Sequence, residues 1–361
     1  MRILFVFNHP AFYKTELLSM IGNADASIQL KVIFERQKNK DRNPKFYSSS
    51  DLDYQYLRGI SFGLENHLSF RLIRLIKKEK FDRIIMNGYS TFTEMVTILY
   101  MIRHHIPYEL YINGGIIRKD SKMKFKLKKK LISHAERYYS PSPVADEYLI
   151  HYGAKKDKIF HYPYATIYEK DIISAPLTDE QKLDIRKKYG IESHLPLFVS
   201  IGQFIPRKNN FTLLEQFKDG SKSLVLIGEG KEEKEYRKWM EEHPQASVFL
   251  LPYMSRKQLF PFLQSCDAYI TLSSEDIYGH TINEALSQGL GVVSSQGVVA
   301  AKTLLNNQNG RIVDPQNHNQ IQSAMNEILD IHYFEHAIKT AKQNTYEKSV
   351  EAHLEFWKEE K

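Results

Sequence analysis

At 361 residues the chain is long for a single hydrophobic core and suits two α/β domains. Its net charge of +7 makes it basic, but no nucleic-acid-binding motif accompanies the charge, so nucleic acid is the least favoured partner. A single cysteine, Cys266, excludes a disulfide framework and fits a reducing, cytoplasmic location, and no run approaches the roughly 20 apolar residues that span a bilayer.

The first half of the sequence alternates between apolar runs and helical patterns. Strands are predicted near residues 2–7, 28–34, 83–86, 108–112 and 137–140. The run at 2–7 is interpreted as a strand and not as a signal peptide, because it is short and no cleavage site follows it. This alternation predicts a parallel sheet.

A polar segment from Glu35 to Tyr56 interrupts the pattern and predicts a long loop. It contains Asp51 and Asp53, which form a D-x-D pair of the kind that binds metals. Such a pair is weak evidence when it stands alone, and no strand pattern frames it as a metal site. We therefore predict no obligatory metal and no cofactor.

The segment 118–132 combines positive charge with apolar residues at helical spacing. Residues 118–130 contain eight basic residues and one acidic residue, and Ile117, Met123, Leu127 and Leu131 or Ile132 recur at helix-compatible intervals. A basic amphipathic helix of this type is attracted to anionic lipid. The alternative is a solvated helix whose apolar stripe packs into the protein core.

The second half begins after a polar crossing that runs from His161 to about residue 190. Strands are predicted near 197–201, 223–227, 247–250, 268–272 and 291–294. We accordingly expect one domain over residues 1–165 and a second over 190–339. A dinucleotide-dependent dehydrogenase is disfavoured, because no G-x-G-x-x-G follows the first strand.

The first strand of the second domain is followed by a glycine and two adjacent cations, namely Gly202, Arg207 and Lys208. Arginine binds phosphate oxygens in a bidentate way, whereas lysine acts as a point charge. The pair therefore offers a basic fork to a diphosphate. An exposed turn with no ligand is the alternative for an isolated pair of this type.

Two carboxylates stand around a glycine turn in the segment from Ser274 to Gly289. Asp276 precedes the turn, and Glu284 follows it on a predicted helix. Between them, Tyr278, Gly279, His280 and Thr281 would present backbone N–H groups at a helix N-terminus, which favours a phosphate. A simpler alternative is a capping box, in which Thr281 caps the helix and Glu284 reaches back to it.

Together these segments make the chain resemble the retaining glycosyltransferases of family 4, the glycosyl transferases group 1, which have the GT-B fold. The resemblance is carried by Gly202 with Arg207-Lys208, by residues 224–230, by Phe249-Leu-Leu-Pro-Tyr253 and by the acidic motif. It implies an α/β architecture of two Rossmann-like domains whose parallel sheets face each other across a cleft. It also implies a C-terminal helix, about residues 340–361, that packs back on the N-terminal domain.

In this family the first acid of an E-x7-E motif touches the donor sugar, and the second holds the ribose of the nucleotide. By position Asp276 matches the first acid, with Glu275 beside it, and Glu284 matches the second. Asp276 replaces the usual Glu, and His280-Thr281 replaces the usual hydrophobic-proline pair, so the donor sugar is the least transferable inference. The resemblance thus implies a donor site that comprises Gly202, Arg207, Lys208, Tyr253, Glu275, Asp276, Tyr278, Gly279, His280, Thr281 and Glu284.

The acceptor side is expected in the N-terminal domain, because ligands of α/β sheets bind just beyond the carboxyl ends of the strands. Two loops follow such strands, and an ordinary turn is the alternative for each. Where many relatives carry a histidine near the second loop, this chain has Asn113. The residues expected on this side are His9, Tyr13, Lys14, Asn113, Gly114 and Gly115.

The resemblance implies a hexosyltransferase that moves a sugar from a UDP- or GDP-linked donor to a hydroxyl of a glycan or lipid-linked glycan, with retention. We expect Arg207, Lys208, Asp276 and His9 to act in the reaction. The expected setting is capsule or exopolysaccharide assembly at the cytoplasmic face of the cell membrane, reached through residues 118–132. A non-catalytic accessory GT-B subunit and a sugar-nucleotide epimerase are the alternatives.

Overall fold

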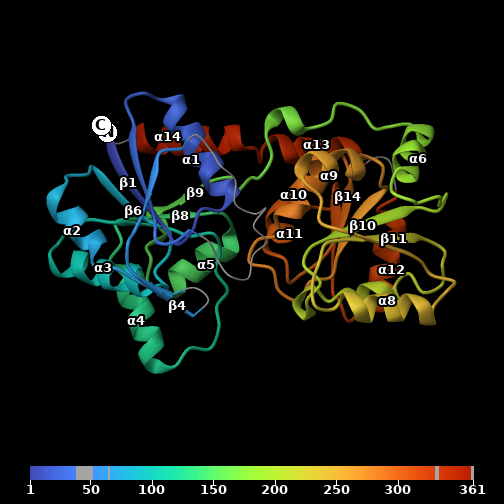
Figure 1. The fold of residues 1–361 in the computed structure, drawn as a ribbon, viewed down its shortest axis with the longest axis horizontal. Helices are drawn as coiled ribbons and strands as arrows, with labels where there is room; N and C mark the ends of the chain where they lie inside the picture. The colour runs from blue at the N-terminus through green and yellow to red at the C-terminus, as the bar shows by residue number, and fades with distance from the viewer. Residues whose placement is uncertain (38–51, 64–65, 330–332, 359–361) are drawn as a thin grey trace. The chain divides into compact units, whose positions relative to one another are not determined.

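The structure is a computed structural model that describes residues 1–37, 52–63, 66–329 and 333–358 (Figure 1). The chain folds into two compact units. Unit 1 consists of residues 1–164 together with 346–361, and unit 2 consists of residues 165–345. Among the described residues, no helix combines the length and the apolar character that crossing a bilayer requires.

Unit 1 is built on a seven-stranded sheet in the order β3-β2-β1-β6-β7-β8-β9, in which every neighbouring pair is parallel. A separate antiparallel pair, β4 and β5, lies outside this sheet. The strands are β1 (Arg2–Phe7), β2 (Gln29–Phe34), β3 (Tyr54–Tyr56), β4 (Ile60–Phe62), β5 (Asn66–Leu68), β6 (Arg83–Met86), β7 (Glu109–Tyr111), β8 (Arg137–Ser140) and β9 (Ile159–His161).

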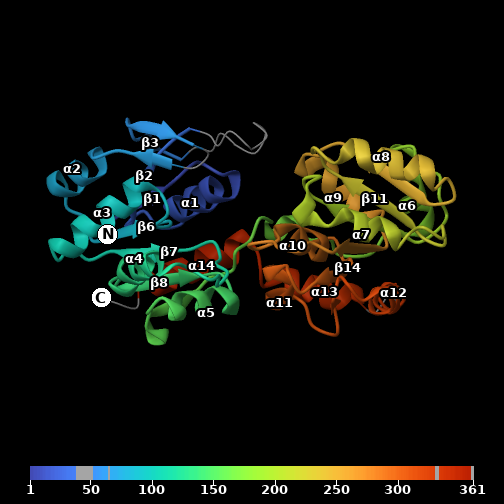
Figure 2. The ribbon, with the colours of Figure 1, turned by 90° about the horizontal axis from the view of Figure 1, so that it is seen from below.

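Helices cover both faces of this sheet, as Figure 1 and Figure 2 show. One face packs against α2 (Arg71–Lys78), α3 (Phe92–Arg103), α4 (Lys122–Ser133) and α5 (Pro143–His151). On the other face α1 (Phe12–Ala24) lies against α14 (Tyr346–Lys358). Cover on both faces explains why a strand such as β1 is a nearly continuous apolar run.

Unit 2 contains a six-stranded parallel sheet in the order β12-β11-β10-β13-β14-β15. Figure 1 shows α8 and α12 on one side of this sheet and α9 and α13 on the other. The strands are β10 (Leu197–Ile201), β11 (Ser223–Ile227), β12 (Ser247–Leu251), β13 (Ala268–Thr271), β14 (Gly291–Ser295) and β15 (Gly310–Val313). The helices are α6 (Asp179–Lys187), α7 (Asn210–Glu215), α8 (Glu233–Glu242), α9 (Arg256–Gln264), α10 (His280–Ser287), α11 (Val299–Leu304), α12 (His318–Glu327) and α13 (Tyr333–Lys342).

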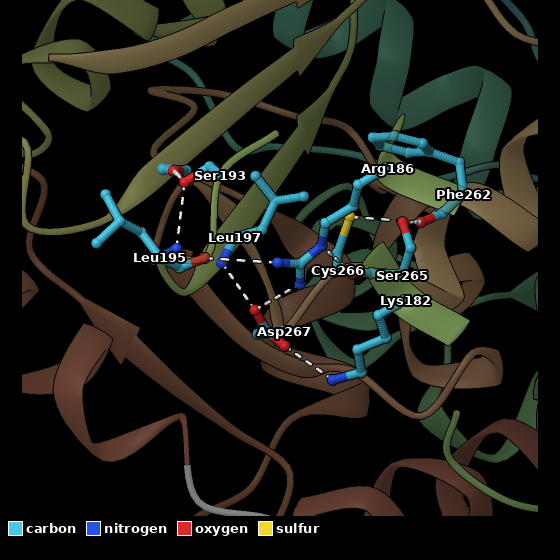
Figure 3. A network of polar contacts seen from close by, with 10 residues as sticks. Lys182, Arg186, Ser193, Leu195, Leu197, Phe262, Ser265, Cys266 and Asp267 are labelled. Atoms are coloured by element: carbon cyan, nitrogen blue, oxygen red, sulfur yellow. Dashed lines mark hydrogen bonds and ion pairs between the residues drawn. The ribbon is translucent and has the colours of Figure 1, made fainter. Parts of the chain in front are cut away.

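A polar network fixes the beginning of this second sheet (Figure 3). Asp267, directly before β13, accepts hydrogen bonds at 2.8 Å from Lys182 Nζ, from Arg186 Nη2 and from the backbone N–H of Leu197. Burial alone would raise the pKa of Asp267, but the two cations and the amide lower it below its ordinary value. The carboxylate thereby joins α6 to the first residues of β10 and β13.

Cys266, next to this carboxylate, has a structural position. It is buried, and burial raises the pKa of its thiol to about 12. A thiol in this environment stays protonated at neutral pH and is not a nucleophile.

The strands predicted from the sequence are confirmed to within one or two residues at each end. Strands of three or four residues, namely β3, β4, β5, β9 and β15, were missed, because so short a run carries little periodicity. The unit boundaries also differ from the predicted ones. Residues 165–189 and 340–345 belong to unit 2, because the first stretch binds α9 and α10 and α13 packs on α10.

The last helix of unit 1 is held by aromatic packing. Trp357 donates a hydrogen bond from Nε1 to the hydroxyl of Tyr139 at 2.7 Å. His353 lies fully buried beside both rings, and its Nδ1 is 2.6 Å from the carbonyl oxygen of Ser349. Burial lowers the pKa of His353 to about 4, so the imidazole is neutral at pH 7.

We predict that His353 makes unit 1 less stable in mild acid. Below about pH 6.5 the unfolded chain binds a proton that folded His353 takes up only near pH 4, so the free energy of unfolding falls as the pH decreases. The expected loss is about 2 kcal/mol between pH 7 and pH 5. Urea unfolding of a Trp239→Phe chain, followed by the fluorescence of Trp357, measures it.

In this background His353→Phe should abolish most of the difference between the two pH values. The control is His318→Phe, because His318 is an exposed histidine in unit 2. If the free energy of unfolding fell equally between pH 7 and pH 5 in His353→Phe and in its parent, His353 would not be the cause of the acid sensitivity.

Candidate functional site

The main candidate site lies at the carboxyl ends of two neighbouring strands of unit 2. β10 and β13 pair in parallel, so the loops that follow them leave the sheet side by side. Gly202, Arg207 and Lys208 follow β10, whereas Glu275 and Asp276 follow β13. The order of strands reverses between β10 and β13, and ligands of open α/β sheets bind at such a switch point.

The two loops are joined by backbone and side-chain hydrogen bonds. Residues 206–208 form a single 3₁₀ turn, and Asn209 follows in the left-handed conformation with φ of 55°. Asn209 donates from Nδ2 to the carbonyl of Leu272 at 3.1 Å, and the N–H of Ser274 donates to the carbonyl of Arg207 at 2.9 Å. The conformation of one loop therefore fixes the other.

These loops bring a cation and a carboxylate together. Lys208 Nζ lies 2.7 Å from Asp276 Oδ2, and their side chains are only 12% and 20% exposed. Burial alone would raise the pKa of Asp276, but Lys208 outweighs this effect and lowers it below its ordinary value. Arg207 is more exposed and donates from Nη1 to the carbonyl of Glu275 at 3.2 Å. The expected phosphate-binding cations and the expected sugar-binding acid thus meet.

The helix that follows Asp276 has a glycine in the left-handed conformation at its N-cap. α10 starts at His280, and its N-cap is Gly279, with φ of 100°. A Cβ atom at this position would lie 2.4 Å from Val298 Cγ1. In the first turn of α10 the N–H of Ile282 donates to the carbonyl of Gly279 at 3.1 Å, and a helix N-terminus of this kind favours an anion.

The capping-box alternative for Thr281 and Glu284 is wrong. The N-cap is Gly279, and no side-chain cap is formed there. Thr281 Oγ1 lies 2.7 Å from the hydroxyl of Tyr269 instead, and the rings of Tyr278 and His280 lie 4.9 Å apart. The glycine moves the helix start two residues toward the N-terminus, which leaves the Glu284 carboxylate available for other contacts.

Glu284, the second acid, interacts with Thr166 and Arg256 and not with Lys208. Its Oε1 accepts a hydrogen bond from Thr166 Oγ1 at 3.2 Å. Burial raises the pKa of Glu284, and both Arg256 and the Thr166 hydroxyl oppose this rise. Tyr253 lies in the loop after β12 and is 43% exposed. Burial and the charge of Glu284 raise the pKa of its phenol. Thr166 and Arg256 were not predicted as site residues.

The predicted residues of unit 1 gather at the carboxyl ends of β1, β6 and β7. Lys14 is buried and donates from Nζ to Asn87 Oδ1 at 2.7 Å. Asn87 in turn donates to the carbonyl of Tyr111 at 3.2 Å and lies 3.4 Å from the amide of Asn113. His9 is the second residue after β1, and the ring of Tyr13 lies 5.6 Å from that of Tyr164.

Asn87 was missed, although it follows a predicted strand as His9 and Asn113 do. Gly115 has a packing explanation, because a Cβ there would lie 2.5 Å from Tyr148 Cγ. Its neighbour Gly114 has φ of 139°, which few other residues adopt. These two glycines are therefore accounted for without a ligand.

Two buried carboxyl groups complete this edge of unit 1. Glu94 Oε2 accepts from the N–H groups of Ser90 and Thr91, and Thr91 Oγ1 donates to Glu35 Oε1 at 2.8 Å. Burial raises the pKa of both Glu35 and Glu94, and the charge of Glu94 raises that of Glu35 further. Neither residue was predicted, although Thr91-x-x-Glu94 is a sequence capping box and Glu35 follows a predicted strand.

Only one residue of the D-x-D pair is described. Asp51 lies outside the described residues, and Asp53 is exposed. Within residues 1–37, 52–63, 66–329 and 333–358, no three His, Cys, Asp or Glu side chains are grouped to hold a metal ion. That the reaction requires no metal and no cofactor stays a prediction.

Unit 2 resembles a known family of proteins. Residues 181–345 match the model of the family "Glycosyl transferases group 1". Unit 2 is therefore similar to this family over most of its length. The match ends at Thr345, where the unit itself ends, and it includes both loops and Glu284.

Solved structures resemble the whole chain and show that its fold is GT-B. HepE from Anabaena, in its complex with UDP, is 14% identical and aligns with a TM-score of 0.76 over 99% of this chain and 100% of its own. A glycosyltransferase from Rickettsia africae is 17% identical and aligns with a TM-score of 0.76 over 99% of this chain and 98% of its own. The expected α/β fold with two parallel sheets is confirmed.

Among curated proteins, an uncharacterized glycosyltransferase of Methanocaldococcus jannaschii is 23% identical over 130 residues. The match covers 36% of this chain and 37% of that relative. Less than two thirds of the relative is therefore matched, and the activity of the whole protein is a matter for proposal.

We predict that Gly279→Ala lowers stability more than the left-handed backbone alone explains. The backbone term is about 1 kcal/mol, and the clash with Val298 adds about 1–3 kcal/mol. Gly190→Ala is a matched control, because Gly190 has φ of 72° and nothing lies within 4 Å of a Cβ there. Thermal unfolding of both variants measures the difference, and equal losses would show that Val298 moves aside.

Proposed function

We propose that the chain is a glycosyltransferase that moves a hexose from a nucleoside-diphosphate sugar to a hydroxyl group of a glycan or lipid-linked glycan, with retention of configuration. The observation that carries this proposal is the pairing of Lys208 with Asp276 at 2.7 Å, at the switch point of the sheet in unit 2. A diphosphate on Lys208 with its sugar toward the loop after β13 would bring that sugar beside Asp276.

The donor is assigned to residues that the fold brings together. Arg207, Lys208 and the amides at the start of α10 bind the diphosphate, because cations and helix N-termini favour phosphate oxygens. Asp276, with Glu275 beside it, accepts from sugar hydroxyls, and Glu284 accepts from the ribose. HepE has been solved with UDP and with UDP-glucose, which supports a UDP-linked donor as the first to test.

The proposed reaction is a front-face substitution at the anomeric carbon. The bond from this carbon to the diphosphate oxygen breaks while the bond to the acceptor oxygen forms, and the acceptor proton passes to the departing diphosphate. Arg207, Lys208 and the amides of His280 and Thr281 stabilise the negative charge that develops on the leaving group. Such electrostatic stabilisation is usually the largest catalytic contribution.

We assign the acceptor to unit 1. Lys14, Asn87 and Asn113 present donors and acceptors at the carboxyl edge of its sheet, where polyhydroxyl ligands can be bound. His9 follows β1 at the same edge and is assigned to the acceptor hydroxyl. These roles, like the setting in capsule or exopolysaccharide assembly, belong to the proposal.

Helix α4 supports a peripheral position at the cytoplasmic face of the cell membrane. Met123 is 84% exposed and Leu127 is 39% exposed, whereas only Leu131 and Ile132 of the predicted stripe are buried. An exposed apolar ridge flanked by lysines favours an anionic lipid surface over the solvated alternative. Lys128 is an exception, because it binds Asp120 at 2.8 Å and Tyr152 at 3.2 Å.

The first test is calorimetric titration of the wild type with UDP, GDP, ADP and CMP. One diphosphate should bind selectively, and Lys208→Ala should weaken it by about 10–100-fold, because a charge-assisted contact is lost. Lys234→Ala is the control, since Lys234 is an exposed lysine on α8.

Failure of the wild type to bind any of the four nucleotides would favour the accessory-subunit alternative. Turnover of a sugar nucleotide without an acceptor would favour the epimerase.

The membrane assignment predicts a loss of vesicle binding when Lys126, Lys129 and Lys130 are replaced by Gln. Each basic residue near an anionic surface contributes about 1 kcal/mol, so affinity for vesicles with 30 mol% phosphatidylserine should fall by about 100-fold. The control removes the same charge from α8 and the turn before it, through Lys231, Lys234 and Lys238. Equal binding of the two triple variants to these vesicles would support the alternative, in which α4 is a solvated surface helix.

A further inference from the structure

A short segment that follows the boundary between the units, residues 166–173, is hydrogen-bonded to residues 284–288 of unit 2. Besides the contact between Thr166 and Glu284, the carbonyl of Asp171 accepts from Gln288 Nε2 at 2.9 Å. The N–H of Ile173 donates to the carbonyl of Ser287 at 3.2 Å. The segment 166–173 therefore lies along the end of α10 that carries Glu284.

Arg256, the first residue of α9, joins this segment to the acid. Its guanidinium donates from Nη2 to the carbonyl of Thr166 and lies 3.6 Å, from Nη1, from Asp171 Oδ2. It also lies over the ring of Tyr168, with 5.4 Å from Cζ to the ring centroid. One residue, Thr166, thus receives the guanidinium at its carbonyl and turns its hydroxyl to Glu284.

We propose that Arg256 and Thr166 are positioning residues for ribose recognition, which aim the Glu284 carboxylate at the two hydroxyl groups of a nucleoside diphosphate. This inference rests on the proposed donor site and adds residues that the acidic motif does not contain. Thr166 occupies one face of Oε1, and a carboxylate offers about four acceptor positions, so acceptor capacity remains for a diol.

The charge of Arg256 has a second effect on this acid. The groups that face Glu284 are Thr166 from the segment 166–173, Arg256 from α9, and the phenols of Tyr253 and Tyr269 from the loop after β12 and from β13. Arg256 is the cation among them. It opposes the rise that burial imposes on the pKa of Glu284 and so favours the ionised form that accepts from hydroxyls.

The test compares UDP with 2′,3′-dideoxyuridine diphosphate, which lacks both ribose hydroxyls. The ratio of the two dissociation constants reports ribose recognition alone. In the wild type UDP should bind at least about tenfold more tightly, since hydrogen bonds to a charged acceptor are lost in the analogue. Arg256→Gln and Thr166→Val should each lower this ratio by about threefold or more, while the affinity for inorganic pyrophosphate stays unchanged.

The pH profile separates positioning from a general structural effect. In Arg256→Gln the ratio should fall as the pH decreases from 8 to 6, because Glu284 then protonates more readily. Arg256→Lys keeps the charge and should restore the profile at least in part. Lys257→Gln removes an exposed cation from the same helix and should change neither the ratio nor its pH profile.

Normal discrimination by the wild type together with an unchanged ratio in Arg256→Gln would overturn this inference alone. So would an equal loss of UDP and pyrophosphate affinity accompanied by a lower melting temperature, which would mark Arg256 as structural. Failure of the wild type to bind UDP would overturn the UDP-linked donor site and this inference with it.

Discussion

The candidate site depends on the pairing of two strands whose sequences lie about seventy residues apart. β10 and β13 are hydrogen-bonded neighbours, and the Asp267 carboxylate holds their first residues together through Lys182, Arg186 and the amide of Leu197. Since both strands run in the same direction, fixing their starts also fixes where they end. The contact between Lys208 and Asp276 follows from this register.

Apolar periodicity was sufficient to locate the longer strands of both sheets, because a parallel strand buried on both faces is a nearly continuous apolar run. Because ligands of α/β sheets bind beyond the carboxyl ends of the strands, the predicted strands then led to residues in the segments that follow them, namely His9, Lys14, Arg207, Lys208 and Asp276. Motif position then assigned the two acids. These parts of the fold and site are local properties of the sequence.

Other parts arise from tertiary contacts that no local pattern contains. Arg256 and Thr166 are ninety residues apart and meet only because the segment after the unit boundary lies along α9 and α10. The capping-box interpretation of Thr281 failed because the conformation of Gly279 starts the helix earlier. In α4 the number of lysines could not show that Lys128 forms an ion pair with Asp120.

The ion pair between Lys208 and Asp276 also makes the ligand-free site nearly self-neutralised. A diphosphate arriving there competes with a carboxylate already bound to the lysine, so part of its Coulomb attraction replaces an existing one. Added salt weakens the internal pair as well as the attraction between lysine and ligand, and the two effects oppose each other. Ionic strength should therefore influence nucleotide affinity less than the number of cations at the site would suggest, and selectivity should depend more on shape and hydrogen bonds than on charge.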